Sequence, residues 1–357
     1  MSNTIASIPF VKPIRDDAAT AVDDMRVTGP APLDADDPDR KNTRPLSFLR
    51  GIDPQDTSHK PFNRRFSEAI SIMSLSKRGR RLLKALEDHD IHLGGLGPGQ
   101  SYGFYLAYDR ALFAQTRDLA ETLRVISHEG RHAEQTIAGF STVTEYHEPG
   151  TALPYDTRSY LRLNRVLEAD ADATALAVLW EVSQADDQYD SYWTDLYQDP
   201  HFGPMAKRFM TAALDSGYDP LDDRSVRAGM QAAFQTWPTV GQPLRSEGYD
   251  DHLMAWLESQ AIKWDKPVPA HDTFEVTDVA KITAIGEAQA YWTPKGDPAT
   301  AHALDQFEDR FRERFAAMGQ QLLPAGKARS LAIDADAVQA WQANRRGQAA
   351  SPAIPRL

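Results

Sequence analysis

The sequence predicts an α+β protein that is predominantly α-helical and contains a small sheet. Apolar residues recur at three- and four-residue spacing through most of the chain, which is the period of an amphipathic helix. One short aromatic-rich segment, residues 102–108, has the length and composition of a strand. With 41% hydrophobic and 25% charged residues the chain can bury a sizeable core, and no apolar run is long enough to cross a membrane.

The two ends of the chain differ in composition from the middle. Residues 1–45 are rich in aspartate, proline, threonine and arginine and poor in aromatics, so we expect a disordered N-terminal arm. Residues 346–357 have a similar composition and predict a flexible tail. Between these ends we expect a core domain over residues 46–185 and a helical lobe over residues 186–345.

Two absences bear on the cellular location. The opening residues show no basic region ahead of an apolar core and no cleavage site, so we expect no signal peptide. The chain has no cysteine, which excludes disulfides, thiolate metal ligands and a cysteine nucleophile. We therefore expect a cytoplasmic protein, and an export address within residues 1–45 stays open as an alternative.

The net charge of −12 arises mainly in one region. Residues 168–223 contain 13 acidic residues against only Lys207 and Arg208. We expect no nucleic-acid partner, because no basic stripe is available to release counterions from phosphates. The acidic region could attract basic substrates, but we favour a solvated face that keeps the protein soluble.

Residues 61–89 predict one or two helices, which carry a short basic cluster. The cluster consists of Lys77, Arg78, Arg80, Arg81 and Lys84. We interpret it as a solvated helix face rather than a binding patch. The next segment contains glycines at 94, 95, 97 and 99, whose spacing fits no nucleotide-binding motif, and we interpret them as turns that lead into the strand at residues 102–108.

The strongest chemical pattern lies in residues 119–135, where His128, Glu129 and His132 form an H-E-x-x-H motif. Apolar spacing predicts a helix here, with Gly139 as its stop. Residues four apart lie one turn apart on the same helix face, so both imidazoles can bind one metal ion. Glu129 is offset around the helix, where its carboxylate can reach a metal-bound water as a general base.

A second helix is predicted over residues 161–180, and it places acids among alanines and leucines. Glu168 and Asp172 are four apart on one face, so Glu168 can ligate a metal while Asp172 accepts a hydrogen bond from the free ring N–H of a ligand histidine. We expect Asp170 to point to solvent. The alternative is a coincidental placement of polar helix residues.

The pattern stays helical after residue 185. Helices are expected within residues 188–198, 204–216, 225–237, 247–264, 277–292 and 302–318. We expect the tryptophans to anchor the helical core rather than to stack on a ligand. They are Trp180, Trp193, Trp237, Trp256, Trp264, Trp292 and Trp341.

H-E-x-x-H followed by E-x-x-A-D at residues 168–172 resembles the gluzincin clan of zinc metallopeptidases, and in particular small bacterial metallopeptidases of unknown substrate. The likeness covers residues 90–185 and is specific only at these two motifs. It implies a zincin-like core with one zinc ion per chain, held by His128, His132 and Glu168, and Glu129 as the base. It also implies that the strand at residues 102–108 binds extended peptide by edge pairing; the alternative is a strand that only covers the helix.

Metallopeptidases commonly stabilise the tetrahedral intermediate with a tyrosine or a histidine. The candidates between the two motif helices are Tyr146, His147, Tyr155 and Tyr160, and His201 and His252 follow further along the chain. No spacing singles out one of them.

Together these patterns predict a zinc-dependent metallopeptidase, a hydrolase that acts on a peptide or protein substrate. One alternative is a zinc-stabilised helical binding or scaffold protein without protease activity. Another is an exported effector protease with the same chemistry. The substrate, the cleavage specificity and the oligomeric state do not follow from the sequence.

Overall fold

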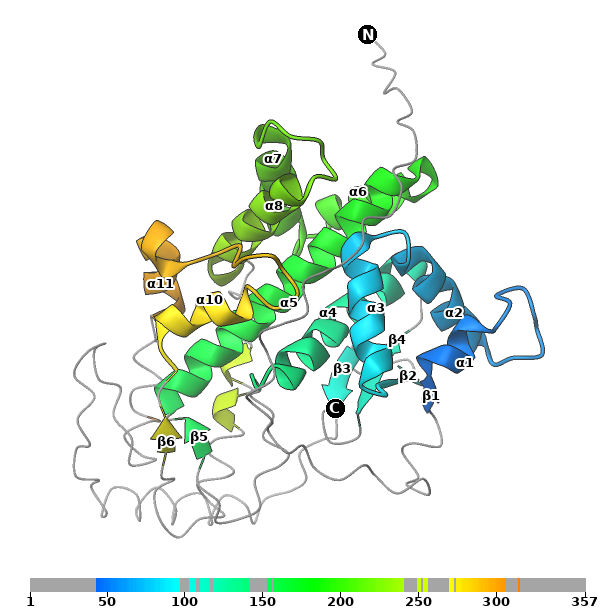
Figure 1. Cartoon of the computed structure of the whole chain (residues 1–357), viewed down its shortest axis with the longest axis horizontal. Coiled ribbons are helices and arrows are strands. Elements are labelled where there is room, and N and C mark those ends of the chain that lie inside the picture. The colour runs from blue at the N-terminus through cyan, green and yellow to red at the C-terminus, as the bar shows by residue number, and fades with distance from the viewer. Residues whose placement is uncertain are drawn as a thin grey trace. The chain divides into compact units, whose positions relative to one another are not determined.

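Figure 1 shows the computed structural model of the chain. The structure describes residues 43–96, 103–106, 110–115, 118–140, 153–155, 157–240, 249–251, 253–255, 270–272, 274–305 and 314. The predicted tail at residues 346–357 lies outside this described part. The predicted arm also lies outside it, except for its last three residues, which form a strand.

The described part of the chain is mainly helical with a small four-stranded sheet, which confirms the predicted fold class. The helices are α1 (Leu46–Arg50), α2 (Pro61–Met73), α3 (Lys77–Asp88), α4 (Leu119–Ile137), α5 (Thr157–Ala185), α6 (Asp190–Gln198), α7 (Gly203–Asp215), α8 (Asp223–Thr236), α10 (Val279–Ile282) and α11 (Pro298–Asp305). Short 3-10 helices are η2 (Asp187–Tyr189), η3 (Trp237–Thr239), η4 (Val276–Asp278) and η5 (Pro294–Gly296). The strands are β1 (Thr43–Pro45), β2 (His92–Leu96), β3 (Gly103–Leu106), β4 (Ala111–Gln115), β5 (Leu153–Tyr155) and β6 (Ala270–Asp272).

The larger sheet has the strand order β1-β2-β4-β3. β2 and β4 are parallel, and β1 and β3 run antiparallel to their neighbours. β3 pairs with β4 from Gly103 opposite Ala114 to Leu106 opposite Ala111. The predicted strand is therefore present, and among the described residues it forms one edge of the sheet, beside α4.

Gly94 and Gly95 lie inside strand β2, so their interpretation as turn residues is wrong. A Cβ atom at Gly94 would lie 2.6 Å from the ring of Phe113, and one at Gly95 would lie 2.9 Å from Phe62. Both glycines therefore make room for aromatic side chains against the sheet. The glycines at 97 and 99 are outside the described residues.

Helix α4 is capped at its start and ends at the glycine that the sequence predicts. The Asp118 side chain caps the start by accepting a hydrogen bond from the backbone N–H of Glu121 at 2.7 Å. At the other end Gly139 takes a φ of +88°, and the N–H of Phe140 reaches back to the carbonyl of Gln135 at 2.8 Å. This is the Schellman arrangement, in which glycine is favoured because the left-handed conformation strains other residues.

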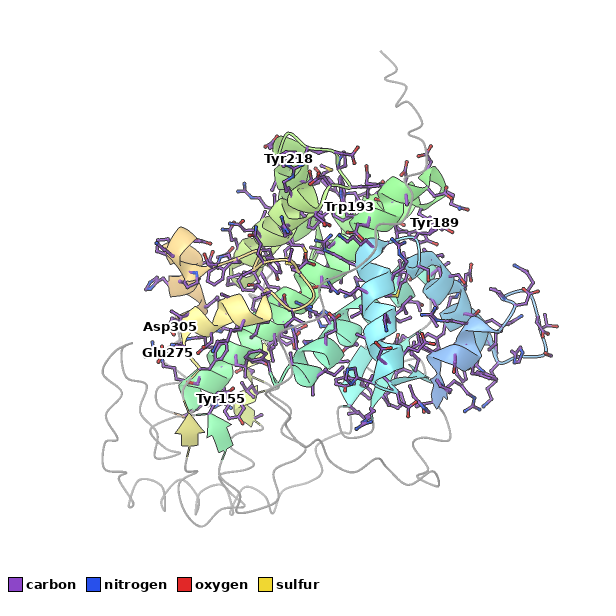
Figure 2. The ribbon with its side chains drawn as sticks, viewed as in Figure 1. Tyr155, Tyr189, Trp193, Tyr218, Glu275 and Asp305 are labelled. Atoms are coloured by element: carbon purple, nitrogen blue, oxygen red, sulfur yellow. The ribbon has the colours of Figure 1, made fainter. Side chains whose placement is uncertain are left out.

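Helix α5 is the longest element and packs against α3, α4, α6 and α8 (Figure 1). Its residues are buried on nearly every face from Ser159 to Ser183. A helix buried all round leaves no solvent-facing side for its charged residues, so each must find a partner within the protein. Arg162, for example, pairs with Asp305 and Glu275, which lie close together in Figure 2.

The basic cluster of α3 is a solvated face only in part: Lys77, Arg80 and Lys84 are exposed as predicted, whereas Arg78 and Arg81 pair with acids of other segments. Arg78 is 2% exposed and pairs with Glu181 of α5 and with Glu287. Arg81 pairs with Glu134 of α4 and with Glu287. The cluster therefore joins α3 to two other parts of the chain, a role that its spacing along one helix could not reveal.

The predicted helices beyond residue 185 are confirmed in three cases, by α6, α7 and α8. The helix predicted over residues 277–292 is wrong, because α10 stops at Ile282 and a turn follows with Gly286 at φ +67°. Residues 249–251 and 253–255 are helical. Four of the tryptophans are buried as expected, namely Trp180, Trp193, Trp237 and Trp292; the other three lie outside the described residues.

The division into a core at 46–185 and a lobe at 186–345 stays a prediction. Helix α5 ends at Ala185, and α6 and α8 pack directly on it. A search of the described helices finds none with the length and apolarity needed to cross a bilayer.

Candidate metal centre

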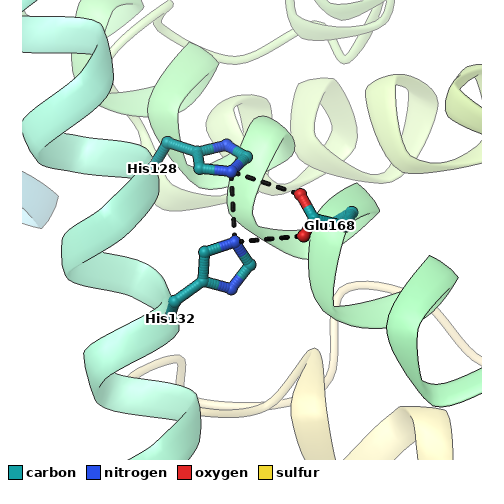
Figure 3. A group of neighbouring side chains, drawn as sticks. All are labelled: His128, His132 and Glu168. Atoms are coloured by element: carbon teal, nitrogen blue, oxygen red, sulfur yellow. Dashed lines mark hydrogen bonds and ion pairs between the residues drawn. The ribbon is translucent and has the colours of Figure 1, made fainter. Parts of the chain in front are cut away.

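Two helices supply the side chains of the candidate site. His128 and His132 lie one turn apart on α4, and Glu168 projects toward them from α5 (Figure 3). The two Nε2 atoms are 3.1 Å apart, and the Glu168 oxygens lie 3.3 Å from Nε2 of His128 and 3.5 Å from Nε2 of His132. The structure thus brings the three sequence-predicted ligands together, with one donor atom from each within 4.8 Å of the others.

The ring of His128 is held from behind by Asp172. Nδ1 of His128 lies 2.9 Å from one oxygen of Asp172, and the other oxygen accepts a hydrogen bond from the indole N–H of Trp237 at 2.9 Å. A carboxylate only accepts hydrogen bonds, so Nδ1 of His128 carries the hydrogen. In the neutral, metal-binding form of the ring, the lone pair of Nε2 then faces His132 and Glu168.

The ring of His132 is held by Gln135, which sequence reasoning did not single out. Nδ1 of His132 lies 2.8 Å from Oε1 of Gln135. The Gln135 amide nitrogen donates to the Leu167 carbonyl at 3.0 Å and to Asp170 at 2.7 Å. Because both of those groups only accept, the amide can face only one way, and Nδ1 of His132 must be the donor. Its Nε2 then also presents a lone pair.

These donor atoms fit a metal ion. Two imidazole lone pairs and a carboxylate converge, and Oε2 of Glu168 is buried without a hydrogen-bond partner. Bonds of about 2.0–2.2 Å at tetrahedral angles separate ligand atoms by roughly 3.4 Å. The Nε2 atoms are 3.1 Å apart, and each lies 3.3 or 3.5 Å from a different oxygen of Glu168, so the separations are close to this value. An unpaired buried oxygen facing unprotonated nitrogens costs free energy that a shared cation would recover.

The electrostatic field of the site favours positive charge. Burial by itself lowers the pKa of His128, but Asp172, Glu168 and Glu129 outweigh burial and raise this pKa to about 10. Burial raises the pKa of Glu168, yet the two histidines hold it well below its ordinary value. Two protonated imidazoles this close would repel each other, whereas one divalent ion shared between them satisfies the same field.

Glu129 lies beside the three candidate ligands but is not one of them. It lines the same cavity, is 9% exposed, and forms no hydrogen bond or ion pair with any residue that the structure describes. Burial raises the pKa of Glu129, and the lowering effect of His128 and His132 does not cancel it. An unpaired carboxylate with a raised pKa is suited to accept and return a proton.

A cavity of about 280 Å³ opens over these side chains. Its walls come from α4, α5, the edge strand β3, and two aromatic residues from other segments. The lining residues outside the site itself include Gly103, Phe104, Tyr105, Phe140, Leu167 and Tyr249. A candidate base, three candidate ligands and the strand at the edge of the described sheet therefore share one cavity.

Residues 51–293, more than half of the chain, match a family model described as "Putative metallopeptidase family (DUF6782)". The chain belongs to this family. Its matched range contains both motif helices and the whole cavity lining. No curated protein and no solved structure matches the chain.

Of the tyrosine and histidine candidates for oxyanion stabilisation, those that the structure describes do not line the cavity. Tyr155 of β5 and Tyr160 of α5 pack on each other, with ring centroids 5.8 Å apart. His201 is also absent from the lining. Tyr146, His147 and His252 lie outside the described residues. Tyr249 does line the cavity, with its ring 5.7 Å from that of Trp237, and no spacing in the sequence indicated it.

Asp170 is 0% exposed, so the prediction that it points to solvent is wrong. It accepts hydrogen bonds from Arg131, Gln135 and Tyr291. The prediction assumed an amphipathic helix with one solvated face, whereas α5 is buried on nearly every side.

Proposed function

We propose that this member of the metallopeptidase family is a zinc-dependent enzyme that hydrolyses peptide bonds. The observation that carries the proposal is the convergence of His128, His132 and Glu168 around one point, with the unpaired carboxylate of Glu129 beside them. Three protein ligands with room for a fourth are the arrangement of catalytic rather than structural zinc sites.

Each side chain has a distinct part in the proposed reaction. His128, His132 and Glu168 would hold the zinc ion, which when bound acts as a Lewis acid toward the scissile carbonyl and makes water more acidic. Glu129 would accept a proton from the attacking water and deliver it to the leaving amine. Asp172 would keep the His128 ring in the orientation that directs Nε2 into the site.

The edge strand β3 supports a peptide as the substrate. Gly103, Phe104 and Tyr105 of this strand line the cavity that contains Glu129. An extended peptide could pair with the outer edge of β3 and so lay its backbone across the site. Edge pairing recognises main-chain groups, which are common to peptides and to unfolded segments of proteins.

The central prediction concerns Glu129→Gln. This change removes the base but keeps the size of the side chain, so we expect kcat/KM on a mixture of quenched fluorescent peptides to fall by about 10²-fold or more. The zinc content, measured by elemental analysis, should equal that of the wild type. The matched control is Glu68→Gln on α2, whose side chain pairs with Arg65 and is not part of the cavity lining. Retained hydrolysis by a zinc-loaded Glu129→Gln protein contradicts the mechanism.

The metal itself is tested on the same preparations. We expect one zinc per chain in the wild type and strongly reduced zinc in His132→Ala and Glu168→Ala, because each substitution removes one of three ligands. A wild type that binds zinc but hydrolyses none of the peptides would favour a zinc-stabilised binding protein. A wild type that takes up no zinc after reconstitution would refute the proposed site.

A further inference from the structure

A relay of hydrogen bonds leads from His132 into the protein, and its first member, Gln135, also lines the cavity. Gln135 accepts from Nδ1 of His132 and donates to Asp170, and its side chain is fully buried. The same amide nitrogen also donates to the carbonyl of Leu167 on α5. Gln135 belongs to α4, the helix that carries both histidines, and these hydrogen bonds join its side chain to α5, the helix that carries Glu168.

Asp170 is the second member of the relay. Besides the amide of Gln135, it accepts two hydrogen bonds from Arg131, at 2.7 and 3.1 Å, and one from the hydroxyl of Tyr291 at 2.6 Å. Four donors directed at one buried carboxylate hold its position firmly. The oxygen that receives the Gln135 amide is therefore not free to move.

Arg131 closes the relay and balances its charge. Its guanidinium group makes five hydrogen bonds, and five is the number of N–H groups it possesses. Two of them reach the carbonyls of Ile282 and Ile285, where α10 ends and the turn after it begins. The charge of Asp170 is neutralised by Arg131, so Nδ1 of His132 meets the neutral amide of Gln135 rather than a charged group.

We propose that Gln135 is a positioning residue of the metal centre, locked in place by Asp170 and Arg131. The hydrogen bonds to Asp170 and Leu167 fix the orientation of the Gln135 amide. The amide oxygen in turn selects the tautomer of His132 that carries its hydrogen on Nδ1, and this tautomer directs the Nε2 lone pair at Glu168. This inference rests on the proposed function, since it assumes that His132 ligates the metal. It extends the site to Gln135 and Tyr291, which neither motif contains.

The test compares Gln135→Met with the wild type in the full-length protein. Methionine has nearly the volume of glutamine but can neither fix the amide orientation nor accept from His132. We expect the affinity for Zn²⁺, measured by competition with a chromophoric chelator, to fall by about 10- to 100-fold. The visible absorption spectrum of the Co²⁺-substituted protein should also change, because it reports the geometry of the ligands.

Two further variants separate positioning from folding. Gln115→Met removes another buried glutamine, on β4 and outside the cavity lining, and should leave both the Zn²⁺ affinity and the Co²⁺ spectrum as in the wild type. Tyr291→Phe removes one donor to Asp170 at the far end of the relay and should lower the affinity in the same direction by a smaller factor. It keeps the inference testable if Gln135→Met does not fold.

The possible outcomes are distinct. Wild-type affinity and an unchanged cobalt spectrum in the relay variants would overturn the positioning role while leaving the proposed function intact. Failure of the wild type to bind Zn²⁺ or Co²⁺ would overturn the proposed function, and this inference with it. Lower affinity in both relay variants, with Gln115→Met unaffected, would support the role.

Discussion

Arg131 occupies one of the two variable positions of the H-E-x-x-H motif, and it is fully buried. Its partners Asp170 and Glu134 are buried carboxylates on two different helices. Removing the cation would leave these two charges with less compensation in a low-dielectric interior, and that costs far more than losing an exposed ion pair. The motif therefore contains a structural anchor as well as the candidate catalytic groups.

We predict that Arg131→Met lowers the free energy of unfolding by about 3–5 kcal/mol, because breaking a buried ion pair strands its partner. The measurement is urea denaturation followed by circular dichroism in a metal-free buffer. Arg80→Met is the matched control, since Arg80 lies on the exposed side of α3 and bonds only to the carbonyls of Ser74 and Leu75. A loss below about 1 kcal/mol in Arg131→Met would show that the ion pair is not needed for stability.

At the scale of elements, the site depends on how closely β3 approaches α4. Gly103 begins β3, and a Cβ atom there would lie 2.3 Å from a methyl carbon of Val125 and 3.2 Å from the side chain of Glu129. Glycine is therefore required at this position by the contact between strand and helix rather than by backbone conformation. The contact sets the width of the cavity beside the candidate base.

We predict that Gly103→Ala pushes β3 away from α4, lowers stability by about 1–3 kcal/mol, and reduces kcat/KM while the zinc content stays at the wild-type level. Peptide hydrolysis and elemental analysis on the same sample make the comparison. In Gly51→Ala the new Cβ would meet only backbone oxygens at 3.5 Å or more, so that variant should behave as the wild type. Equal activity in both alanine variants would mean that the strand edge takes no part in substrate binding.

Across the whole molecule, buried ion pairs connect segments that are far apart in the sequence. Glu287 forms ion pairs with Arg78 and Arg81 of α3, and Arg81 also pairs with Glu134 of α4. Burial by itself raises the pKa of Glu287, but the two guanidinium groups outweigh burial and hold the pKa below its ordinary value of 4.5. The charged form of Glu287 therefore stabilises the fold.

The pH dependence of stability follows from the sign of this shift. A carboxyl group whose pKa is lower in the folded state contributes its full stabilisation above pH 4.5 and loses it as the pH falls through the folded-state pKa. We predict that the free energy of unfolding of the wild type declines below about pH 4.5 and that Glu287→Gln flattens this decline. Denaturation curves between about pH 3 and 7 test it, with Glu87→Gln, at an exposed site, as the control. An unchanged slope in Glu287→Gln would contradict the assignment.

Much of the local structure could be predicted because it depends on short-range patterns. The H-E-x-x-H spacing places His128 and His132 on one helix face, and Gly139 marks the end of that helix. The four-residue step from Glu168 to Asp172 gives two carboxylates that both face His128. These relations follow from the geometry of one turn of helix, which is the same in every protein.

Side chains whose role depends on a distant partner could not be predicted in this way. Asp170 and Asp172 have nearly the same local sequence, yet one faces His128 and the other faces Arg131 and Tyr291. Tyr249 and Trp237 reach the site only because the chain returns to it far beyond α5. Local spacing was therefore enough to indicate the candidate ligands, the base and Asp172 as a partner of a ligand histidine. The contacts that fix Gln135 against Asp170 and Leu167 were decided by packing, because burial and long-range hydrogen bonds arise only once the helices are assembled.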